Sequence, residues 1–493
     1  MMKVHILTEG GKGIGLGHIT RCISLYQAFK KRGISPTLVI NGDDSVRKLL
    51  KGKKYRVFNW LKEQKKLFQM IRKGDIAVID SYLAGHRTYK KISDLAPISA
   101  YLDDYKRLVY PRGIVINGGF QAKDIRYPRK ENIKYLLGPG FIPIRTEFRD
   151  MPPRKIRPVI KSILISFGGC DTKNLTAKLL EFLNAMYPNV RKNILISDAF
   201  KDTQVAEKPA EPMCVFIKNP DPMKLKTVML NSDIAISAGG QTLNELARTG
   251  TPTIGVCVAE NQKMHLSYWA ETGFLSYAGR YDDKDLLKKV HRAIISLQDK
   301  RVRKGMSLCG RETVDGRGPE RIIKFILSEY FRNRLTLQKA TLRDAREIFN
   351  LSTDKEVRKN SFQPKRFDFK HHLGWLRERL RDVNCVFYIF KIGHEFIGQL
   401  RFNVDNEKKC ATVNISLVEK MRNFNLSSFL VENSIRKLLK HHKHLRSIRA
   451  YVKRHNIASV KLFERTNFKF SGNRTVKGAK TRVYIRKVSA GNV

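Results

Sequence analysis

A glycine-rich segment near the start of the chain carries a histidine followed three residues later by an arginine. It reads Gly10-Gly11-Lys12-Gly13-Ile14-Gly15-Leu16-Gly17-His18-Ile19-Thr20-Arg21. Glycines let a ligand approach the backbone, and a helix N-terminus offers free N–H groups to an anion. The helix dipole disfavours a cationic histidine at that position, so we expect His18 to be neutral and able to act as a general base. A flexible turn would also explain the glycines, and a structural or exposed histidine would explain His18.

A second segment has groups suited to a nucleoside diphosphate. It reads Ser237-Ala238-Gly239-Gly240-Gln241-Thr242-Leu243-Asn244-Glu245. Gly239, Gly240 and Thr242 offer backbone and hydroxyl donors to a diphosphate, and Glu245 offers acceptors to a ribose diol. An ordinary capped turn between strand and helix is the alternative. The loop Ser166-Phe167-Gly168-Gly169-Cys170-Asp171 is similar, and Glu260-Asn261-Gln262 adds polar groups after another strand.

Short apolar runs rich in β-branched residues precede these segments, which is typical of buried strands. In the first region the predicted strands are Val4–Leu7, Thr37–Ile40, Ile76–Ile79, Ile98–Leu102 and Ile114–Ile116, with a helix from about Ile19 to Lys31. In the second region they are Ile163–Phe167, Ile194–Ile196, Val215–Ile217, Ile234–Ile236 and Thr253–Val256. Alternating strands and helices predict parallel sheets, whose ligands bind at the carboxyl ends of the strands. The Pro- and Arg-rich stretch 149–158 is the expected linker.

A third region, from about Leu335, has a different pattern that predicts a mixed α+β domain. The predicted strands are Thr336–Lys339, Cys385–Lys391, Glu395–Asn403, Ala411–Leu417 and Ser447–Val452, with a hairpin around Gly393. The predicted helices are Leu342–Leu351, His371–Leu380, Ser427–Leu439 and Ala458–Thr466. The adjacent His371 and His372 are expected on a solvated surface, whereas Trp375 is expected in the helix core or in the wall of an acceptor pocket.

The chain is basic throughout, with 95 Lys and Arg against 45 Asp and Glu in 493 residues and a formal net charge of +50. These residues are spread out, so we interpret them as a solvated surface that favours anionic ligands rather than as a nucleic-acid interface. No apolar run approaches the roughly 20 residues that span a bilayer. The 7 cysteines include no Cys-x-x-Cys pair. We therefore expect a cytoplasmic protein with no disulfide framework, metal site, membrane insertion or specific nucleic-acid partner.

Residues 1 to about 330 resemble the UDP-sugar hydrolase of pseudaminic acid biosynthesis, a GT-B-shaped enzyme related to the MurG type of glycosyltransferase. Besides the glycine segments, the matching pieces are Val78-Ile79-Asp80-Ser81-Tyr82, Leu102-Asp103-Asp104 and Glu260-Asn261-Gln262. The resemblance implies two doubly wound Rossmann-like domains, at 1–148 and 159–330. It also implies hydrolysis of a UDP-2,4-diacetamido-2,4,6-trideoxy-hexose by water that attacks C1. A glycosyltransferase, which would place an acceptor hydroxyl where this water lies, is an alternative enzyme. A basic binding protein without catalytic activity is the alternative that is not an enzyme.

The resemblance assigns roles to residues of this chain. His18 is the expected base, and Asp80, Tyr82 and Asn261 are expected near the sugar or the attacked carbon. The residues expected to hold UDP are Gly239, Gly240, Thr242 and Glu245. The other expected substrate-binding residues are Gly15, Gly17, Arg21, Gly168 and Gly169.

The third region, 335–489, resembles the GNAT acetyltransferases, especially the one that acts a step earlier in the same sugar pathway. The matching stretches are Phe396–Phe402, Val413–Leu417 and Asn456–Phe468. The resemblance implies acetyl-CoA as co-substrate and a UDP-linked 4-amino sugar as acceptor. The expected cofactor-binding residues are Leu417, Arg422, Asn423, Asn425, Leu426, Ser427 and Asn456.

This third region departs from the GNAT pattern at two places. The usual glycines of the pyrophosphate loop are replaced in Arg422-Asn423-Phe424-Asn425-Leu426-Ser427. Asparagine tolerates the left-handed backbone better than other non-glycine residues, so we expect the loop to keep its shape. Phe463 occupies the position where many members have a tyrosine that protonates the leaving thiolate, and phenylalanine has no proton to give. The sequence thus predicts a bifunctional sugar-nucleotide enzyme.

Overall fold

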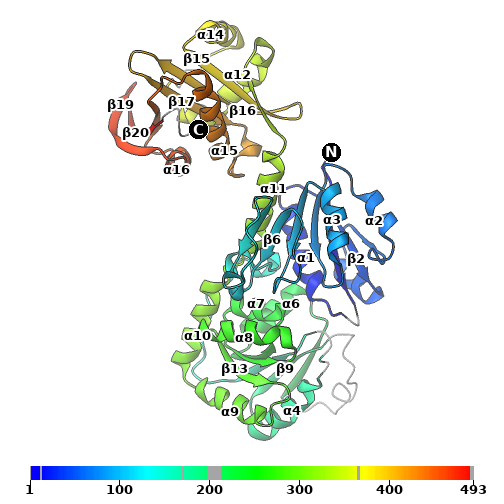
Figure 1. The fold of residues 1–493 in the computed structure, drawn as a ribbon. Helices are drawn as coiled ribbons and strands as arrows, with labels where there is room; N and C mark the ends of the chain where they lie inside the picture. Colours follow the sequence, from blue (N-terminus) through cyan, green and yellow to red (C-terminus); the bar gives the residue numbers. More distant parts are fainter. Residues whose placement is uncertain are drawn as a thin grey trace. The chain divides into compact units, whose positions relative to one another are not determined.

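The computed structural model describes residues 2–11, 14–168, 171, 173–196, 213–363 and 367–488 (Figure 1). The chain divides into two compact units, Met1–Ile326 and Leu327–Val493. The first unit contains two parallel sheets and the second contains one mixed sheet. This confirms the predicted fold class of two Rossmann-like regions followed by a GNAT-like α+β region, whereas the predicted boundaries of three domains stay a prediction.

The first sheet has the strand order β3-β2-β1-β4-β5-β6-β7, and all its strands are parallel. Its strands are β1 (Val4–Gly10), β2 (Thr37–Gly42), β3 (Tyr55–Val57), β4 (Ile76–Asp80), β5 (Ile98–Leu102), β6 (Gly113–Asn117) and β7 (Ile133–Leu137). The connecting helices are α1 (Gly17–Lys30), α2 (Gln64–Met70) and α3 (His86–Leu95), with 3-10 turns η1 (Asp44–Leu50), η2 (Phe120–Lys123), η3 (Pro139–Phe141) and η4 (Thr146–Phe148). The order reverses direction beside β1 and β4, so the loops after these strands flank the crevice where such folds bind ligands.

The second sheet has the order β10-β9-β8-β11-β12-β13 and is also parallel. Its strands are β8 (Ser162–Ser166), β9 (Arg191–Ile196), β10 (Cys214–Lys218), β11 (Ile234–Ala238), β12 (Thr253–Cys257) and β13 (Leu275–Arg280). Its helices are α4 (Leu175–Met186), α6 (Pro222–Asn231), α7 (Gln241–Thr249), α8 (Glu260–Glu271), α9 (Leu286–Ser296), α10 (Lys300–Thr313) and α11 (Gly318–Arg332). The central strands β8, β11 and β12 are buried along their whole length, which explains their continuous apolar sequence.

The sheet of the second unit has the order β14-β15-β16-β17-β18-β20-β19. Its strands are β14 (Leu335–Lys339), β15 (Cys385–Ile392), β16 (Glu395–Asp405), β17 (Cys410–Leu417), β18 (Ser447–Lys453), β19 (Lys469–Val476) and β20 (Ala479–Lys487). Its helical segments are η5 (Leu342–Asp344), α12 (Ala345–Thr353), α13 (Lys355–Asn360), α14 (Phe369–Arg381), η6 (Glu419–Met421), α15 (Leu426–His441) and α16 (Ile457–Arg465). Only β17 and β18 pair in parallel in this sheet, as far as the described residues extend.

Candidate active sites

His18 lies at the N-terminus of α1, directly above the end of β4. Its Nδ1 is 2.7 Å from Oδ1 of Asp80, the last residue of β4. Arg21, one turn further along α1, donates from Nε to Asp80 Oδ2 at 2.5 Å and from Nη2 to Oδ1 at 2.6 Å. His18 Nδ1 and Arg21 Nη2 are therefore 3.1 Å apart because both donate to one carboxylate oxygen. With its proton on Nδ1, the imidazole keeps an unprotonated Nε2 that can accept a proton from a ligand or from water.

The carboxylate of Asp80 is fully buried, and its charge is balanced within the site. Burial alone would raise the pKa of Asp80, but the charges and hydrogen bonds of Arg21 and His18 lower it below its ordinary range. Burial likewise opposes the charged form of Arg21, but the charges of Asp104 and Asp80 raise its pKa well above the usual value. Asp80 and Arg21 thus remain an ion pair at neutral pH and hold His18 in one orientation.

A second carboxylate extends this network to the next strand of the sheet. Asp104, just after β5, accepts from Arg21 Nη1 at 2.9 Å through both of its oxygens and accepts the hydroxyl proton of Tyr82. The ring of Tyr82 meets the His18 ring edge to face, with 4.5 Å between their centroids. Burial and the charge of Asp104 raise the pKa of Tyr82, so its hydroxyl stays protonated. The phenol therefore forms a rigid wall beside the imidazole.

Glu9 at the end of β1 fixes the loop that carries Tyr82. Its buried carboxylate accepts from Ser81 Oγ at 2.5 Å and from the backbone nitrogens of Tyr82 at 2.6 Å and Leu83 at 3.2 Å. The sequence analysis did not single out Glu9, because its partners lie more than 70 positions away in the chain.

The predicted glycines border open space at several points. A Cβ atom built on Gly15, Gly17, Gly168 or Gly240 would meet no atom within 4 Å. Gly15 and Gly168 also have positive φ angles of 86° and 82°, which favour glycine. Gly239 differs, since its added Cβ would lie 2.9 Å from Leu266 Cγ. The four open glycines therefore leave room for a ligand beside the backbone, while Gly239 packs against α8.

The Gly240 loop opens α7, as predicted, and Glu245 lies one turn inside that helix. Glu245 is buried and accepts from Arg145, with Nε and Nη2 at 2.8 and 2.7 Å from its Oε1. Burial raises the pKa of Glu245, and the charge of Arg145 opposes this rise. Gly240 is the N-cap of α7 without a side-chain hydrogen bond, so amides of the first turn remain open to an anion.

Helix α8 carries a histidine close to the first site. Trp269 Nε1 donates to His265 Nε2 at 3.0 Å, so the neutral ring carries its proton on Nδ1. Burial lowers the pKa of His265, and the negative charge of Asp104 opposes the shift. The same helix contacts the end of η2 through Tyr268 Oη, which donates to Asp124 at 2.6 Å. The sequence analysis did not single out His265, because a single histidine inside a helix does not indicate which residues of other segments it will contact.

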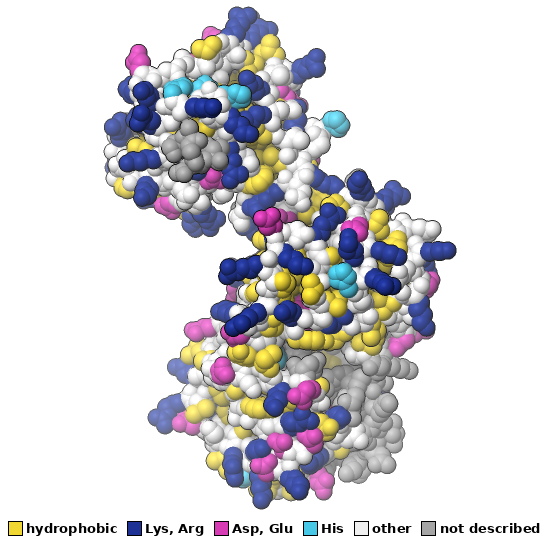
Figure 2. Space-filling model, in the orientation of Figure 1, with side chains coloured by type: hydrophobic (Ala, Val, Ile, Leu, Met, Phe, Trp, Pro, Cys, Tyr) yellow, Lys and Arg dark blue, Asp and Glu magenta, His cyan; other side chains and the backbone are white. Residues whose placement is uncertain are grey.

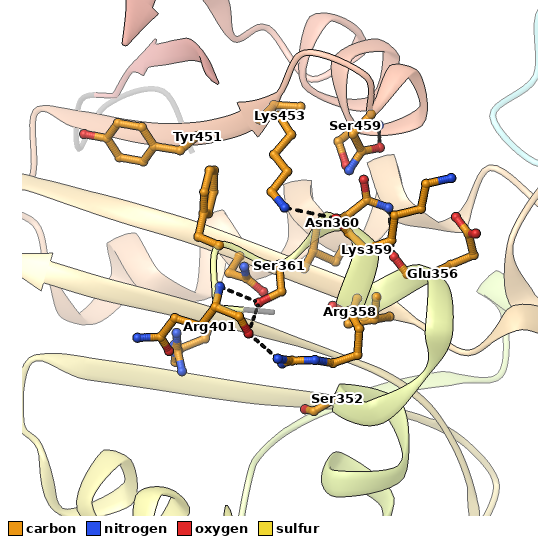
Figure 3. Close-up of a pocket in the computed structure, with 18 of the residues that line it drawn as sticks. Ser352, Glu356, Arg358, Lys359, Asn360, Ser361, Arg401, Tyr451, Lys453 and Ser459 are labelled. Atoms are coloured by element: carbon orange, nitrogen blue, oxygen red, sulfur yellow. Dashed lines mark hydrogen bonds between the residues drawn. The ribbon is translucent and has the colours of Figure 1, made fainter. Parts of the chain in front are cut away.

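The second unit contains a wedge between β17 and β18. These strands pair only from Cys410 to Thr412, although β17 continues to Leu417 on its other side with β16. The edge of β17 beyond Thr412 therefore has backbone groups free of β18. A cavity of about 1340 Å³ opens here, and Val413 to Leu417 line it together with the start of α16 (Figure 3).

The loop Arg422-Asn423-Phe424-Asn425-Leu426-Ser427 keeps the left-handed shape that we expected from its asparagines. Asn423 and Asn425 have φ angles of 75° and 54°. Asn425 is the N-cap of α15 and makes no side-chain cap, so the first amides of α15 are available to an anion. Ser328 Oγ donates to the carbonyl of Phe424 and anchors the middle of the loop.

The predicted residues are distributed over both units. His18, Arg21, Asp80 and Tyr82 form one connected network, and Leu417, Arg422 and Asn456 line the cavity of the second unit. Asn423, Asn425, Leu426 and Ser427 form the adjoining loop and helix start. Thr242 lies in the first turn of α7 and is half-buried. Gly169 and the side chain of Asn261 lie outside the described residues.

One expectation about the second unit is wrong. Both histidines border the cavity, but His372 is only 4% exposed, whereas its neighbour His371 is solvated as expected. Successive residues of a helix point about 100° apart, so a polar pair in sequence can have one buried member. In the described part of the chain, no group of three or more His, Cys, Asp or Glu side chains is arranged to hold a metal ion. The described helices also include none that is long and apolar enough to cross a membrane.

Three curated proteins illustrate what the chain is similar to. An uncharacterized protein of Methanocaldococcus jannaschii is 24% identical over 95% of this chain and 97% of its own length. A Helicobacter pylori protein, the pseudaminic acid cytidylyltransferase and UDP-2,4-diacetamido-2,4,6-trideoxy-β-L-altropyranose hydrolase, is 25% identical over 53% of this chain and 45% of its own length. The spore coat polysaccharide biosynthesis protein SpsG of Bacillus subtilis is 24% identical over 67% of this chain and 99% of its own length.

The carboxyl-terminal region also matches known proteins. Residues 334–469 match the acetyltransferase (GNAT) domain. A solved spermidine N-acetyltransferase of Vibrio cholerae in complex with CoA and spermine is 16% identical over 31% of this chain and 96% of that chain, with a TM-score of 0.29. The chain thus has homologues among proteins of sugar-nucleotide and polysaccharide biosynthesis and carries a GNAT acetyltransferase domain at residues 334–469.

Proposed function

We propose that the first unit hydrolyses a UDP-linked 2,4-diacetamido-2,4,6-trideoxy-hexose to UDP and the free sugar, with His18 as the base. The observation that carries this proposal is the 2.7 Å contact between His18 Nδ1 and the buried Asp80. It orients the ring and leaves Nε2 to take a proton. The homologous Helicobacter pylori protein, whose name includes such a hydrolase, supports the choice of substrate.

The proposed reaction is a single displacement. A water oxygen attacks C1 of the sugar while its proton passes to His18 Nε2, and the bond between C1 and the UDP oxygen breaks. The imidazolium that forms is stabilised by the ionised Asp80. The open amides at Gly240 would hold the diphosphate of the leaving group, whose negative charge the helix N-terminus favours. The sugar leaves with inverted configuration at C1.

We also propose that the second unit transfers the acetyl group of acetyl-CoA to the 4-amino group of the UDP-sugar that precedes the hydrolase substrate. The residues present fit acetyl-CoA, because the free edge of β17 suits an extended pantetheine chain and the loop at Asn423 and Asn425 suits its pyrophosphate. When bound, acetyl-CoA supplies an activated acyl group. The chain's own residues would orient the amine and exclude water from the cavity.

Incubation of the full chain with the 4-amino UDP-sugar and acetyl-CoA tests both activities at once. Release of CoA together with UDP, in the absence of any added acceptor, is the expected result. UDP that appears only with an added acceptor would favour a glycosyltransferase instead. Neither product, together with tight and salt-sensitive nucleic-acid binding, would favour a basic binding protein.

A further inference from the structure

The cavity of the second unit reaches beyond the wedge to the neighbouring strand β16. Arg401 of β16 lines it (Figure 3). Gln399 of β16 and His372 and Trp375 of α14 line it as well. In the sheet register, Arg401 lies opposite Asn414, which is two residues past the last pairing of β17 with β18. This part of the cavity is therefore one strand away from the wedge. Neighbouring strands of a sheet lie about 5 Å apart.

Three polar side chains in this part of the cavity have an atom without a hydrogen-bond partner. These atoms are Gln399 Oε1, Arg401 Nε and His372 Nε2. Gln399 is 9% exposed and His372 is 4% exposed, so water from the bulk reaches them poorly. Buried polar atoms are almost always paired in native proteins, and a cluster of unpaired ones in a cavity indicates a polar ligand.

Arg401 is the charged member of this cluster. Its guanidinium forms no ion pair with a described carboxylate and instead lies 5.0 Å from the centre of the Trp375 ring and 6.0 Å from that of Phe387. The two aromatic rings restrict its movement without neutralising its charge. A fixed, unneutralised guanidinium binds phosphate and carboxylate groups through paired hydrogen bonds.

The remaining charged residues of the cavity are mostly cations. Among the described lining residues the cations are Arg358, Lys359, Arg401, Arg422, Lys453 and Lys477. Glu356 is the acidic residue found in that lining. Such a wall attracts anions and repels a polycation such as a polyamine.

We propose that Arg401, with Gln399 and His372, binds an acidic group of the acceptor, so that the acceptor is an amine carrying a phosphate or carboxylate rather than a polyamine. The inference rests on the proposed acetyl transfer and identifies the residues that select its acceptor. The acidic group is held at β16 while the amine reaches the acetyl group in the adjacent wedge.

The test compares acceptors on the full chain by following CoA release. The acceptors are the 4-amino UDP-sugar, the same amino sugar without UDP, an amino sugar that carries a carboxylate, and spermidine. The variant is Arg401→Gln, and Arg379→Gln is the matched control, since Arg379 lies on the same helix as Trp375 and pairs with Asp382 outside the cavity. The two anionic acceptors distinguish a phosphate from a carboxylate as the recognised group.

We expect Arg401→Gln to lower kcat/KM for the preferred anionic acceptor about 30-fold, mainly through KM, because a charge-assisted contact is lost. The KM for acetyl-CoA and the slow rate on the uncharged amino sugar should stay within about twofold, and Arg379→Gln should behave as the parent. Equal loss on charged and uncharged acceptors, no loss at all, or a preference for spermidine would overturn the proposal.

A binding measurement separates this inference from the proposed acetyl transfer. Calorimetric titration of the full chain with UDP-N-acetylglucosamine, which has no free amine, should show a binding event beside that of the proposed UDP site at Gly240. Arg401→Gln should weaken this second event about 30-fold and Arg379→Gln should retain it. This difference would support the anion site even if no amine were acetylated. Identical titrations of the parent and Arg401→Gln would overturn it.

Discussion

Replacing Asp80 with asparagine removes one negative charge from the network around His18. In the structure, Asp80 is fully buried and accepts from His18 Nδ1 at 2.7 Å and from Arg21 Nε at 2.5 Å. The asparagine amide has nearly the same shape but presents an NH₂ group to one of these donors. The variant Asp80→Asn therefore tests the charge of this residue rather than its volume.

The expected effects follow from burial and from the partners that remain. Breaking a buried ion pair costs about 3–5 kcal/mol. Arg21 keeps its contacts with Asp104, so we expect about 3 kcal/mol of lost stability. UDP release should fall by roughly 10³ to 10⁴, because the imidazole loses the group that fixes its tautomer and stabilises its cation.

The effect on stability should depend on pH in a defined direction. The pKa of Asp80 is lower in the folded protein than the roughly 3.9 of an unfolded aspartate, so the unfolded chain binds more protons at acid pH. The stabilisation from Asp80 is thus complete above about pH 4 and is lost as the pH falls through the folded value. The difference in unfolding free energy between parent and Asp80→Asn should shrink below pH 4.

The same strand provides a matched control at its other end. Asp75 precedes β4 and pairs with His5, with 3.1 Å between His5 Nε2 and Asp75 Oδ2 in a buried contact. Urea unfolding and a coupled assay of UDP release should show that Asp75→Asn loses stability but keeps its rate within about threefold. If Asp80→Asn also kept its rate within threefold, or if both variants lost activity equally, the assigned role of Asp80 would be refuted.

Further predictions concern one loop, one buried cation and one backbone conformation. Gly240→Val should leave the melting temperature nearly unchanged but weaken UDP binding at least tenfold by calorimetry, because the added atoms enter open space; Gly239→Val should instead lower the melting temperature, since its Cβ collides with Leu266. Arg154 donates to four oxygens at the ends of α6 and α7 and just after them, and burial lowers its pKa to about 10. Arg154→Met should cost about 2–4 kcal/mol in urea unfolding with no change in kcat, and a lower kcat at full folding would contradict this. Asn425→Gly should preserve the KM for acetyl-CoA. Asn425→Val should raise it severalfold, because the φ angle of residue 425 is 54° and a β-branched residue adopts such a backbone at a cost. Equal KM values in the two variants would contradict the role of this loop in binding acetyl-CoA.

Strands with strong apolar patterns were predictable, and weakly patterned ones were not. The sequence predicted Ile98–Leu102 with the bounds that β5 has in the structure. It missed β19, whose polar residues are mostly exposed, and β7, in which Lys134 interrupts a short apolar run. Burial against a neighbouring strand decides such segments, and this cannot be derived from local residue types.

The candidate sites show the same limit. Local rules were enough to place His18 at the start of a helix and to predict the left-handed asparagines after Leu417. They were not enough to pair His18 with Asp80, which is 62 residues away, or Arg145 with Glu245, which is 100 residues away. Contacts at these separations depend on sheet order, which the sequence pattern leaves open.

The many basic residues of the chain affect ligand binding in two ways, one general and one specific. Lys and Arg side chains cover the visible face of the molecule in many places and without a single concentrated stripe (Figure 2). This agrees with the expected solvated surface and gives only general attraction to anions. Selectivity instead requires fixed cations in concave places, such as Arg401 in the cavity of the second unit.

Hydrolysis in water enriched in ¹⁸O tests the central claim most directly. If water attacks C1 with His18 as the base, the UDP released from the 2,4-diacetamido UDP-sugar should carry no ¹⁸O by mass spectrometry. The same reaction should slow by at least 10³ in His18→Ala, since the general base is lost. UDP that carries the label, which would mean attack at phosphorus, or an unchanged rate in His18→Ala, would contradict the account.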